Sequence, residues 1–411
     1  MVAQIQKEVK NAKLQIFTCD KTTPALIIKK ANDRFGINLS LDIEFIVLEG
    51  KEWILPQTWK HFTLFGQSFG SIVLGFRASR FSIPDILIDT TGFVFFGVVM
   101  KLMGSSRVGA YVHYPTISID MITRVKTGQP MYNNAKLITH SKLLTTLKIL
   151  YYKIFATWYR FGGLFVDFTA VNSRWTNAHI RSLWGKNDEN SMIIYPPCSP
   201  HNFSPGSGQV MAVTDRQPAI LSISQFRPEK EHKKQVDIME KLLQNLSDHS
   251  KSQRFKLILA GSIRSDEDLK YLESIQKYTT KKGLSDVVDF KINLDFKDLK
   301  QLYSKSLIGL HTMNQEHFGI GIVEMMAAGL VMVAHRSGGP ESDIVVDFED
   351  KPVGFLAATT DEYVDVISRV FRMEDKELTM LRENAIRSVL QRFSDKSFYD
   401  NIAIFIERLV L

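Results

Sequence analysis

The stretch NQEHFGIGIVEMMAAGLVMVAHRSGGPESDIV, from Asn314 to Val345, decides the fold class. The apolar run Ile308–His311 precedes it, and a second apolar run, Val331–His335, lies within it. Both runs have the composition of buried parallel strands. The glycines between them let backbone amides approach a ligand, and the start of the intervening helix favours phosphate. Strand, loop, helix, strand and a second glycine loop together outline a nucleotide pocket.

Two carboxylates flank the first loop. Glu316 precedes the residues HFGIG, and Glu324 follows eight positions later on the expected helix. Each can accept hydrogen bonds from hydroxyls, one from a sugar and the other from a ribose. The alternative is that both are solvated helix-end charges and that the glycines only form turns. A glycoside hydrolase also works with two carboxylates. The sequence fixes no distance between them, but the glycine loops favour a ligand that carries phosphate.

A basic segment follows the expected first strand of the second half. SISQFRPEKEH (Ser222–His232) places Arg227 and Lys230 in a loop or a first helical turn. Cations there can stabilise a departing diphosphate, whose charge grows in the transition state. The alternative is a surface basic cluster, because two more lysines follow. We therefore treat both residues as candidates for neutralising a diphosphate.

A histidine stands at the end of an expected strand in the first half. His113 lies in the segment YVHYP (Tyr111–Pro115), where an apolar run ends and the chain turns. In a doubly wound domain this position faces the ligand cleft. The alternative is a structural histidine, so His113 is a candidate site residue only together with the other signals.

Short apolar runs alternate with amphipathic stretches along the chain, which predicts parallel α/β units. The expected strands are Lys13–Thr18, Ile43–Leu48, Ile86–Asp89, Val108–Val112, Phe168–Val171, Ala219–Ser222, Lys256–Ala260, Val288–Lys291, Ile308–His311 and Val331–His335. The expected helices include Phe62–Arg80, Lys233–Ser247, Asp266–Lys281, Phe296–Ser304, Val323–Ala328 and Asp361–Arg372. The proline-rich segment Tyr195–Gly208 indicates a linker. We expect two doubly wound, Rossmann-like domains, residues 1–200 and 201–390, facing each other across a cleft, with residues 391–411 as a final segment.

Composition narrows the class of protein. The 411 residues are 45% apolar and 23% charged, which excludes a mainly disordered chain. The net charge of +7 suits anionic ligands, but no compact basic motif indicates nucleic acid. The two cysteines, Cys19 and Cys198, lie far apart and form no zinc motif. No loop carries an Asp-x-Asp tripeptide, so we expect no metal and no cofactor, and Arg and Lys neutralise the diphosphate.

The segment Ser141–Phe168 differs from the rest of the chain. It mixes leucine, isoleucine and aromatic residues with Lys142, Lys148, Lys153 and Arg160. Aromatic and basic residues on one amphipathic helix are typical of a membrane interface. The alternative is a packed helix whose lysines extend their charged ends to water. No run of residues is long and apolar enough to predict a membrane-spanning helix.

These residues, together with several other segments of the chain, resemble a known family. Glu316 through Glu324 resembles the E-x7-E donor motif of retaining glycosyltransferase family 4, which has the GT-B fold. More segments resemble the α-1,2-mannosyltransferases of the dolichol-linked N-glycan pathway, namely HFTLFGQSFGSI, YVHYPTIS, IYPPC, QFRPEK, FKIN and GLHTMNQEHFGIGIVE. The resemblance implies GDP-mannose as donor and a dolichyl-pyrophosphate oligosaccharide with three mannoses as acceptor. It also implies addition of two α-1,2-linked mannoses at the cytosolic face of the endoplasmic reticulum, near other early mannosyltransferases.

The resemblance assigns roles by position. Glu316 would bind the donor sugar hydroxyls and Glu324 the ribose. Arg227 and Lys230 would neutralise the diphosphate, and His113 would lie beside the transferred sugar. The remaining donor-binding positions are Phe318, Gly319, Ile320, Ser224, Gln225, Gly338 and Gly339. The final segment Phe393–Leu411 would cross back to the first domain.

Two departures from the family pattern leave alternatives open. The arginine of the basic pair usually lies five positions before the lysine, where this chain has Gln225. The family also begins with a membrane anchor, a strand and a glycine-rich loop, and this chain starts in what resembles the helix that follows. We therefore expect a first domain without its first βα unit. The alternatives are a catalytically silent binding or assembly subunit and a different nucleotide-sugar glycosyltransferase.

Overall fold

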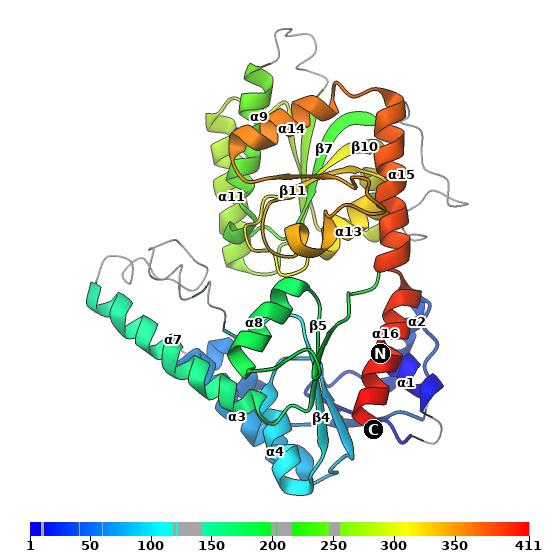
Figure 1. The fold of residues 1–411 in the computed structure, drawn as a ribbon. Helices are drawn as coiled ribbons and strands as arrows, with labels where there is room; N and C mark the ends of the chain where they lie inside the picture. Colours follow the sequence, from blue (N-terminus) through cyan, green and yellow to red (C-terminus); the bar gives the residue numbers. More distant parts are fainter. Residues whose placement is uncertain are drawn as a thin grey trace.

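The structure is a computed structural model of the chain. It describes residues 1–9, 12–40, 42–59, 61–117, 121, 142–198, 203, 216–245 and 255–410. Figure 1 shows two α/β domains, one above the other, with the last helices running from one to the other. Most of the expected linker Tyr195–Gly208 lies outside the described residues.

The first domain contains two parallel sheets. One pairs β1 with β2, and the other has the strand order β3-β4-β5-β6. The strands are β1 (Gln15–Thr18), β2 (Glu44–Val47), β3 (Ile86–Asp89), β4 (Arg107–Val112), β5 (Phe168–Val171) and β6 (Ser191–Ile193). The helices are α1 (Val2–Glu8), α2 (Pro24–Phe35), α3 (Thr63–Ser79), α4 (Val94–Gly104), α7 (Lys142–Gly163) and α8 (Arg174–Trp184).

The second domain is built on one parallel sheet with the order β12-β11-β10-β7-β8-β9. Its strands are β7 (Gln217–Ile223), β8 (Lys256–Gly261), β9 (Val288–Ile292), β10 (Ser306–Leu310), β11 (Val331–His335) and β12 (Phe355–Ala357). Its helices are α9 (His232–Gln244), α11 (Asp266–Lys281), α12 (Phe296–Lys305), α13 (Ile320–Ala327), α14 (Thr360–Val370) and α15 (Asp375–Arg392), with short helices η5 (Pro228–Lys230) and η6 (Pro340–Ile344).

The strand order positions the site. The chain starts the sheet at β7, adds β8 and β9 on one side, and then returns to place β10 on the other side. The loops after β7 and β10 therefore leave the same edge in opposite directions. Ligands of doubly wound sheets bind at such a switch point, at the carboxyl ends of the strands.

The core explains why the strands read as unbroken apolar runs. Along β8, Leu257 and Leu259 pack on one face of the sheet, and Ile258 and Ala260 pack on the other. Both faces are thus covered, so polar residues are excluded from the strand centres. The first domain is packed in the same manner around β4, with Val108 and Tyr111 in clusters on opposite sides.

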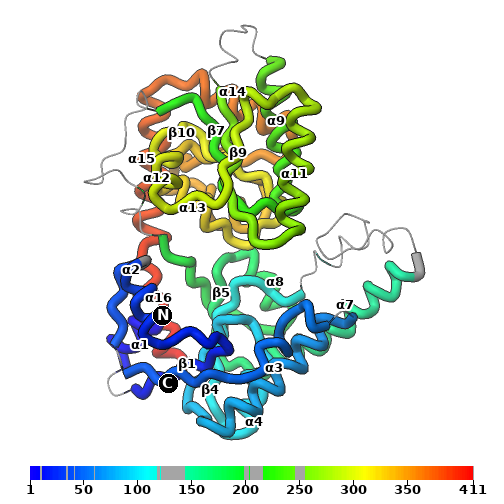
Figure 2. The backbone as a smooth tube through the Cα atoms, turned by 180° about the vertical axis from the view of Figure 1, so that it is seen from behind, coloured from blue at the N-terminus to red at the C-terminus, as the bar shows by residue number. Residues whose placement is uncertain are grey.

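The last helix, α16 (Asp395–Val410), packs on the first domain. A Cβ on Gly109 of β4 would come within 2.5 Å of Leu409 and 3.0 Å of Phe405, so a larger residue there would displace these two side chains of the helix. Figures 1 and 2 show α15 beside the second domain and α16 beside the first, with both chain termini on the first domain. The chain therefore crosses between the domains more than once.

The predicted fold class is confirmed: both domains are parallel α/β structures, and every expected strand is present within a few residues. The short strands β6 and β12 were not expected, because three residues give no readable pattern. The helix after the first glycine loop begins at Ile320, whereas Val323 was expected. Gly319 and Gly321 obscured this start, since glycine is a weak helix former.

Candidate functional site

Two loops meet at the switch point of the six-stranded sheet in the second domain. The loop after β7 carries Lys230, and the loop after β10 carries Glu316. Lys230 Nζ lies 2.6 Å from Glu316 Oε2, and His311 Nε2 lies 3.1 Å from the same oxygen. Lys230 Nζ also donates to the sulfur of Met313 at 3.0 Å. The topology therefore places a cation, a histidine and a carboxylate together at the expected ligand edge.

Glu316 is ionised in this setting. Burial pushes its pKa upward, but the hydrogen bond with His311 and the charge of Lys230 more than compensate, and the net pKa lies well below the usual range. The side chains of Glu316 and Lys230 are 14% and 21% exposed, so solvent still reaches the pair. A carboxylate held ready to accept hydrogen bonds beside an ammonium suits a ligand with hydroxyls and phosphates.

Backbone geometry fixes the loop that carries Glu316. Gly319 has a φ of +106° and Gly338 a φ of +61°, which side chains rarely tolerate. A Cβ on Gly338 would lie 2.3 Å from the carbonyl oxygen of Glu316, so the two loops are packed too closely for any other residue. The amide of Gly339 donates to that same carbonyl at 2.7 Å. The second glycine loop therefore supports the first, and the amide of Gly339 is engaged within the protein.

Residues Phe318 to Glu324 lead into α13. Phe318 is buried and stacks at 5.8 Å on Tyr195, so its side chain anchors the loop. Ile320 is the first residue of the helix and is exposed. One oxygen of Glu324 accepts a hydrogen bond from the hydroxyl of Tyr303 at 3.0 Å. Tyr303 is buried, and burial raises its pKa well above the usual value, so it remains a donor to Glu324.

The loop after β7 holds three more candidates. Ser224 Oγ lies 3.0 Å from Nε2 of the buried His232. The guanidinium of Arg227 pairs with the buried Asp268 at 3.3 Å, which directs it toward α11, whereas Lys230 pairs with Glu316. These contacts separate the two cations that the sequence placed together.

Gln225 has a charged neighbour that the sequence did not indicate. With its amide oriented to satisfy both groups, the oxygen of Gln225 accepts from the guanidinium of Arg264 at 2.9 Å. Arg264 lies in the loop after β8, and its backbone amide donates to Asp268 at 3.0 Å. An arginine is thus present at the place where Gln225 departs from the family pattern. Sequence spacing could not reveal it, because 39 residues separate the two positions.

His113 lies on the first domain at the carboxyl end of β4. Its side chain is exposed and its ring is 4.4 Å from that of Tyr111, while its carbonyl accepts from Asn172 at 2.9 Å. The next residue, Tyr114, has its ring 4.1 Å from the ring of His317 in the second domain. The strand end that carries His113 therefore lies against the Glu316 loop.

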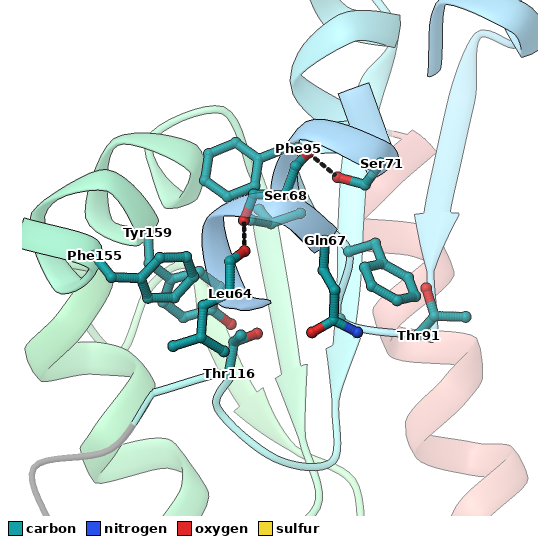
Figure 3. Close-up of a pocket in the computed structure, with 12 residues that line it drawn as sticks. Leu64, Gln67, Ser68, Ser71, Thr91, Phe95, Thr116, Phe155 and Tyr159 are labelled. Atoms are coloured by element: carbon teal, nitrogen blue, oxygen red, sulfur yellow. Dashed lines mark hydrogen bonds between the residues drawn. The ribbon is translucent and has the colours of Figure 1, made fainter. Parts of the chain in front are cut away.

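A separate pocket of about 70 Å³ lies in the first domain, between α3, α7 and the loops after β3 and β4. Figure 3 shows Gln67, Thr91 and Thr116 among the side chains that line it, with the aromatic rings of Phe155 and Tyr159 at the left of the view. The hydroxyls of Ser68 and Ser71 bond to carbonyls of their own helix at 2.8 Å. The pocket lies at the carboxyl ends of the strands in the four-stranded sheet of the first domain, on the edge that faces the second domain.

The structure brings together Glu316, Lys230 and the glycine loops, as the sequence indicated, and it adds His311, Arg264 and Tyr303. His311 ends the apolar run before the loop, a position that could have drawn attention to it. The roles of the candidate residues toward a ligand stay predictions. Among the described residues, no group of three or more histidine, cysteine, aspartate or glutamate side chains is placed to hold a metal ion.

Known proteins share this fold. HepE of Anabaena, crystallised with UDP and glucose, superimposes with a TM-score of 0.61 at 16% identity, covering 96% of this chain and 99% of its own. A UDP-forming α,α-trehalose-phosphate synthase from Burkholderia xenovorans gives a TM-score of 0.70 at 10% identity, covering 97% and 100%. Residues 209–388 match the family model described as glycosyl transferases group 1. The protein is therefore a glycosyltransferase with the GT-B fold.

Sequence relatives define the family more narrowly. Residues 1–184 match the model described as ALG11 mannosyltransferase N-terminus. A relative from Xenopus laevis is 41% identical over 97% of this chain and 81% of its own length. The human relative is 38% identical over 98% and 82%. Both are named GDP-Man:Man(3)GlcNAc(2)-PP-Dol alpha-1,2-mannosyltransferase. The chain belongs to this family, and the resemblance drawn from its sequence is confirmed.

Proposed function

We propose that this protein transfers mannose from GDP-mannose to a dolichyl-pyrophosphate oligosaccharide. It adds two α-1,2-linked mannoses to Man(3)GlcNAc(2), with retention at the sugar carbon, at the cytosolic face of the endoplasmic reticulum. The names of the relatives support the donor and the acceptor. The observation that carries the proposal is the Glu316–Lys230 pair at the switch point of the sheet in the second domain.

Each charged group has a place in this reaction. GDP-mannose brings a diphosphate, which competes with Glu316 for the ammonium of Lys230. When the bond from the sugar to the diphosphate breaks, negative charge develops on the leaving oxygen, and Lys230 stabilises it. Glu316, freed from the lysine, accepts hydrogen bonds from the sugar hydroxyls. Arg264 adds positive charge at the rim, Arg227 would join it only by leaving Asp268, and Glu324 accepts from the ribose.

The first domain supplies the acceptor side in this proposal. Its carboxyl edge carries His113 and the pocket beneath α7. The hydroxyl of Thr91 donates to Asp89 and the amide nitrogen of Gln67 donates to the carbonyl of Ile54, both at 2.7 Å, so the oxygens of these side chains can accept from the hydroxyls of a sugar. The acceptor would lie between this edge and the Glu316 loop, with His113 beside the transferred mannose.

A membrane surface would hold the lipid part of the acceptor, and α7 is suited to lie on it. Its outer face carries apolar side chains at helical spacing that are 45% to 65% exposed, namely Leu147, Leu150, Ile154, Phe161 and the adjoining Leu164. The helix contains four basic residues and no aspartate or glutamate. An exposed apolar stripe with basic neighbours fits the surface of a bilayer with anionic lipids.

The apolar surface continues on α3. Phe62, Phe69 and Phe76 recur at every seventh position and are 50% to 69% exposed, and the ring of Phe62 lies 5.5 Å from that of Tyr151 on α7. Figures 1 and 2 place α3 and α7 on the same side of the first domain. In the part of the chain that the structure covers, no helix is long and apolar enough to span a bilayer.

The test is transfer from labelled GDP-mannose to a synthetic lipid-linked trimannosyl acceptor. We expect activity in the unmodified protein and a loss of at least about 100-fold in Glu316→Ala. The matched control is Glu273→Ala, which removes an exposed carboxylate from α11 and should leave the rate unchanged. Full activity in Glu316→Ala would refute the site. Binding of GDP-mannose without transfer would contradict the enzyme and favour a silent subunit.

We further propose that no metal ion takes part, because Lys230 and Arg264 can neutralise the diphosphate, with Arg227 added where it leaves Asp268. Activity should therefore be the same with a chelator as with added magnesium or manganese. A rate that falls with chelator and returns with one of these ions would contradict this part of the proposal.

A further inference from the structure

The first turn of α8, in the first domain, contacts the loop that carries Glu316 in the second. Ser173 caps α8: its hydroxyl accepts from the amide of Thr176 at 3.0 Å and donates to the carbonyl of His317 at 2.6 Å. Trp175 Nε1 donates to the side-chain oxygen of Gln315 at 2.6 Å. The two acceptors are the residues on either side of Glu316, so both flanks of the carboxylate are held from the other domain.

Gln315 needs this support. Its φ of +60° lies in the left-handed region, which is unfavourable for a residue with a long side chain. Such a conformation persists only where neighbouring contacts enforce it. The amide of Gln315 donates to Ser337 Oγ at 2.8 Å within its own domain, and its side chain is held by Trp175. The direction in which Glu316 leaves the backbone depends on this conformation.

The ring of His317 makes a second bridge between the domains. It lies 4.1 Å from the ring of Tyr114 and 4.9 Å from that of Trp175, measured between centroids. Both partners belong to the first domain, and Tyr114 directly follows His113. Ring contacts at these distances stabilise the arrangement beyond the area they bury.

The start of α8 is itself fixed by the second domain. The carboxylate of Asp343 in η6 is fully buried, and both of its oxygens lie 3.1 Å from the amide of Arg174. One oxygen also accepts from the hydroxyl of Tyr195 at 2.8 Å. A negative group at the N-terminus of a helix is favourable. The contact therefore sets the position of Ser173 and Trp175 relative to the second domain.

We infer that Ser173 and Trp175 are positioning residues, which hold the Glu316 loop in its working conformation from the first domain. The donor-side carboxylate is then correctly placed only while the two domains are in contact. Binding of the acceptor to the first domain and use of the donor in the second are thereby linked. The inference rests on the proposed role of Glu316, but the contacts themselves do not.

The experiment is hydrogen exchange of the backbone amides in residues 311–319, together with transfer kinetics, for Trp175→Phe. This change keeps an aromatic ring and removes the donor to Gln315. We expect exchange in this segment to become about five- to tenfold faster, which is the effect of losing one hydrogen bond. Exchange in α9 and α11 should not change. The value of kcat should fall by about tenfold, with a smaller change in KM for GDP-mannose.

The controls separate positioning from general damage. Trp158→Phe makes the same chemical change on α7, where Trp158 stacks on Phe95 at 5.0 Å, and should leave residues 311–319 unaffected. In a double-mutant cycle, Gln315→Ala combined with Trp175→Phe should be no worse than the more harmful single change. Unchanged exchange in Trp175→Phe, or fully additive effects, would overturn the inference. Exchange needs no substrate, so this result can be read even if mannose transfer itself fails.

Discussion

At the scale of single residues, Lys230 and Glu316 satisfy each other's charge. Their 2.6 Å contact keeps a buried carboxylate from standing alone, which would be costly. A diphosphate can replace Glu316 as the partner of the lysine, and sugar hydroxyls can replace the lysine as the partner of Glu316. The ion pair is thus a resting arrangement that a donor with both groups exchanges.

Lys230→Met tests this arrangement. The change removes the ammonium and leaves Glu316 with His311, so the transition-state charge on the diphosphate loses its nearest cation. We expect kcat/KM for mannose transfer to fall by about 10²- to 10³-fold. Steady-state kinetics measure this, with Lys270→Met, an exposed lysine on α11, as control. A fall smaller than about threefold would contradict the role of Lys230.

His232 gives a prediction about pH. Burial, together with the charge of Lys230, lowers its pKa to about 3, so the folded protein keeps it neutral. The unfolded chain binds a proton near the ordinary value of about 6.5. Stability from this residue is therefore complete above that pH and falls as the pH drops toward 3, by about 1.4 kcal/mol per unit.

The measurement is chemical unfolding between pH 7 and 5 for the unmodified protein and for His232→Gln. The variant should show the shallower dependence, because glutamine does not titrate. His335, whose pKa burial lowers to about 4, is present in both proteins and cancels in the comparison. Equal slopes would contradict the assignment of a neutral, buried His232.

Sequence reasoning found Glu316 from its glycine loop and Lys230 from its basic segment. Glu316 and Lys230 lie in the loops that follow β10 and β7, and strand ends of a parallel sheet meet at one edge, so their proximity was predictable. The partner of Arg227, Asp268, and the partner of Gln225, Arg264, depend on how α11 packs. Such contacts arise from tertiary packing, which single-sequence patterns do not contain.

At the scale of helices and strands, burial on both faces made the strands readable. The inner strands β7, β8, β10 and β11 contain only apolar or small residues at their centres, whereas the edge strand β9 carries Asp289 and Lys291, and the expected bounds agree closely with the structure. α7 was identified as amphipathic, but only the structure shows which face is which. Its buried side carries Tyr152, Phe155 and Tyr159, and its exposed side carries Leu147, Leu150 and Ile154. One face of α7 is therefore apolar because it packs in the core of the first domain, and the other face is apolar without such packing, which the membrane proposal explains.

A paired substitution on α7, Leu147→Glu with Ile154→Glu, tests the membrane proposal. Each side chain contributes roughly 1.5–3 kcal/mol when its apolar surface leaves water. We expect binding to vesicles with anionic phospholipid to weaken by more than about tenfold, measured by co-sedimentation. Leu269→Glu on α11, a leucine that is 43% exposed, is the matched control. Vesicle binding that is unchanged by the α7 pair would contradict the proposed face.

At the scale of the whole molecule, the two domains are joined by the α8 contacts and by α16. Asp343→Asn tests the first of these, because the amide nitrogen cannot accept from Arg174 as a carboxylate oxygen does. Loss of a charged, buried acceptor costs about 1.5–3 kcal/mol. We expect the domains to separate more often, which raises the radius of gyration in small-angle X-ray scattering. Asp347→Asn, an exposed neighbour, is the control. An identical scattering curve for Asp343→Asn would contradict this account of the domain contact.

The arrangement of the domains could not be predicted from the sequence beyond its class. The doubly wound pattern indicates a cleft, and it says nothing of which loops cross it. Ser173 and Trp175 lie 140 residues or more from the loop they contact, and nothing in their local sequence marks them. Contacts of this kind bury few residues and leave no periodic signal in the chain.

The most direct test of the central claim is analysis of the product formed from GDP-mannose and a lipid-linked Man(3)GlcNAc(2) acceptor. We predict a mass gain of two hexoses, both removed by an α-1,2-specific mannosidase, and no gain with Glu316→Ala. Absence of any hexose gain in the unmodified protein, or the same gain with Glu316→Ala, would contradict the assignment of Glu316 and Lys230 as a mannose-donor site.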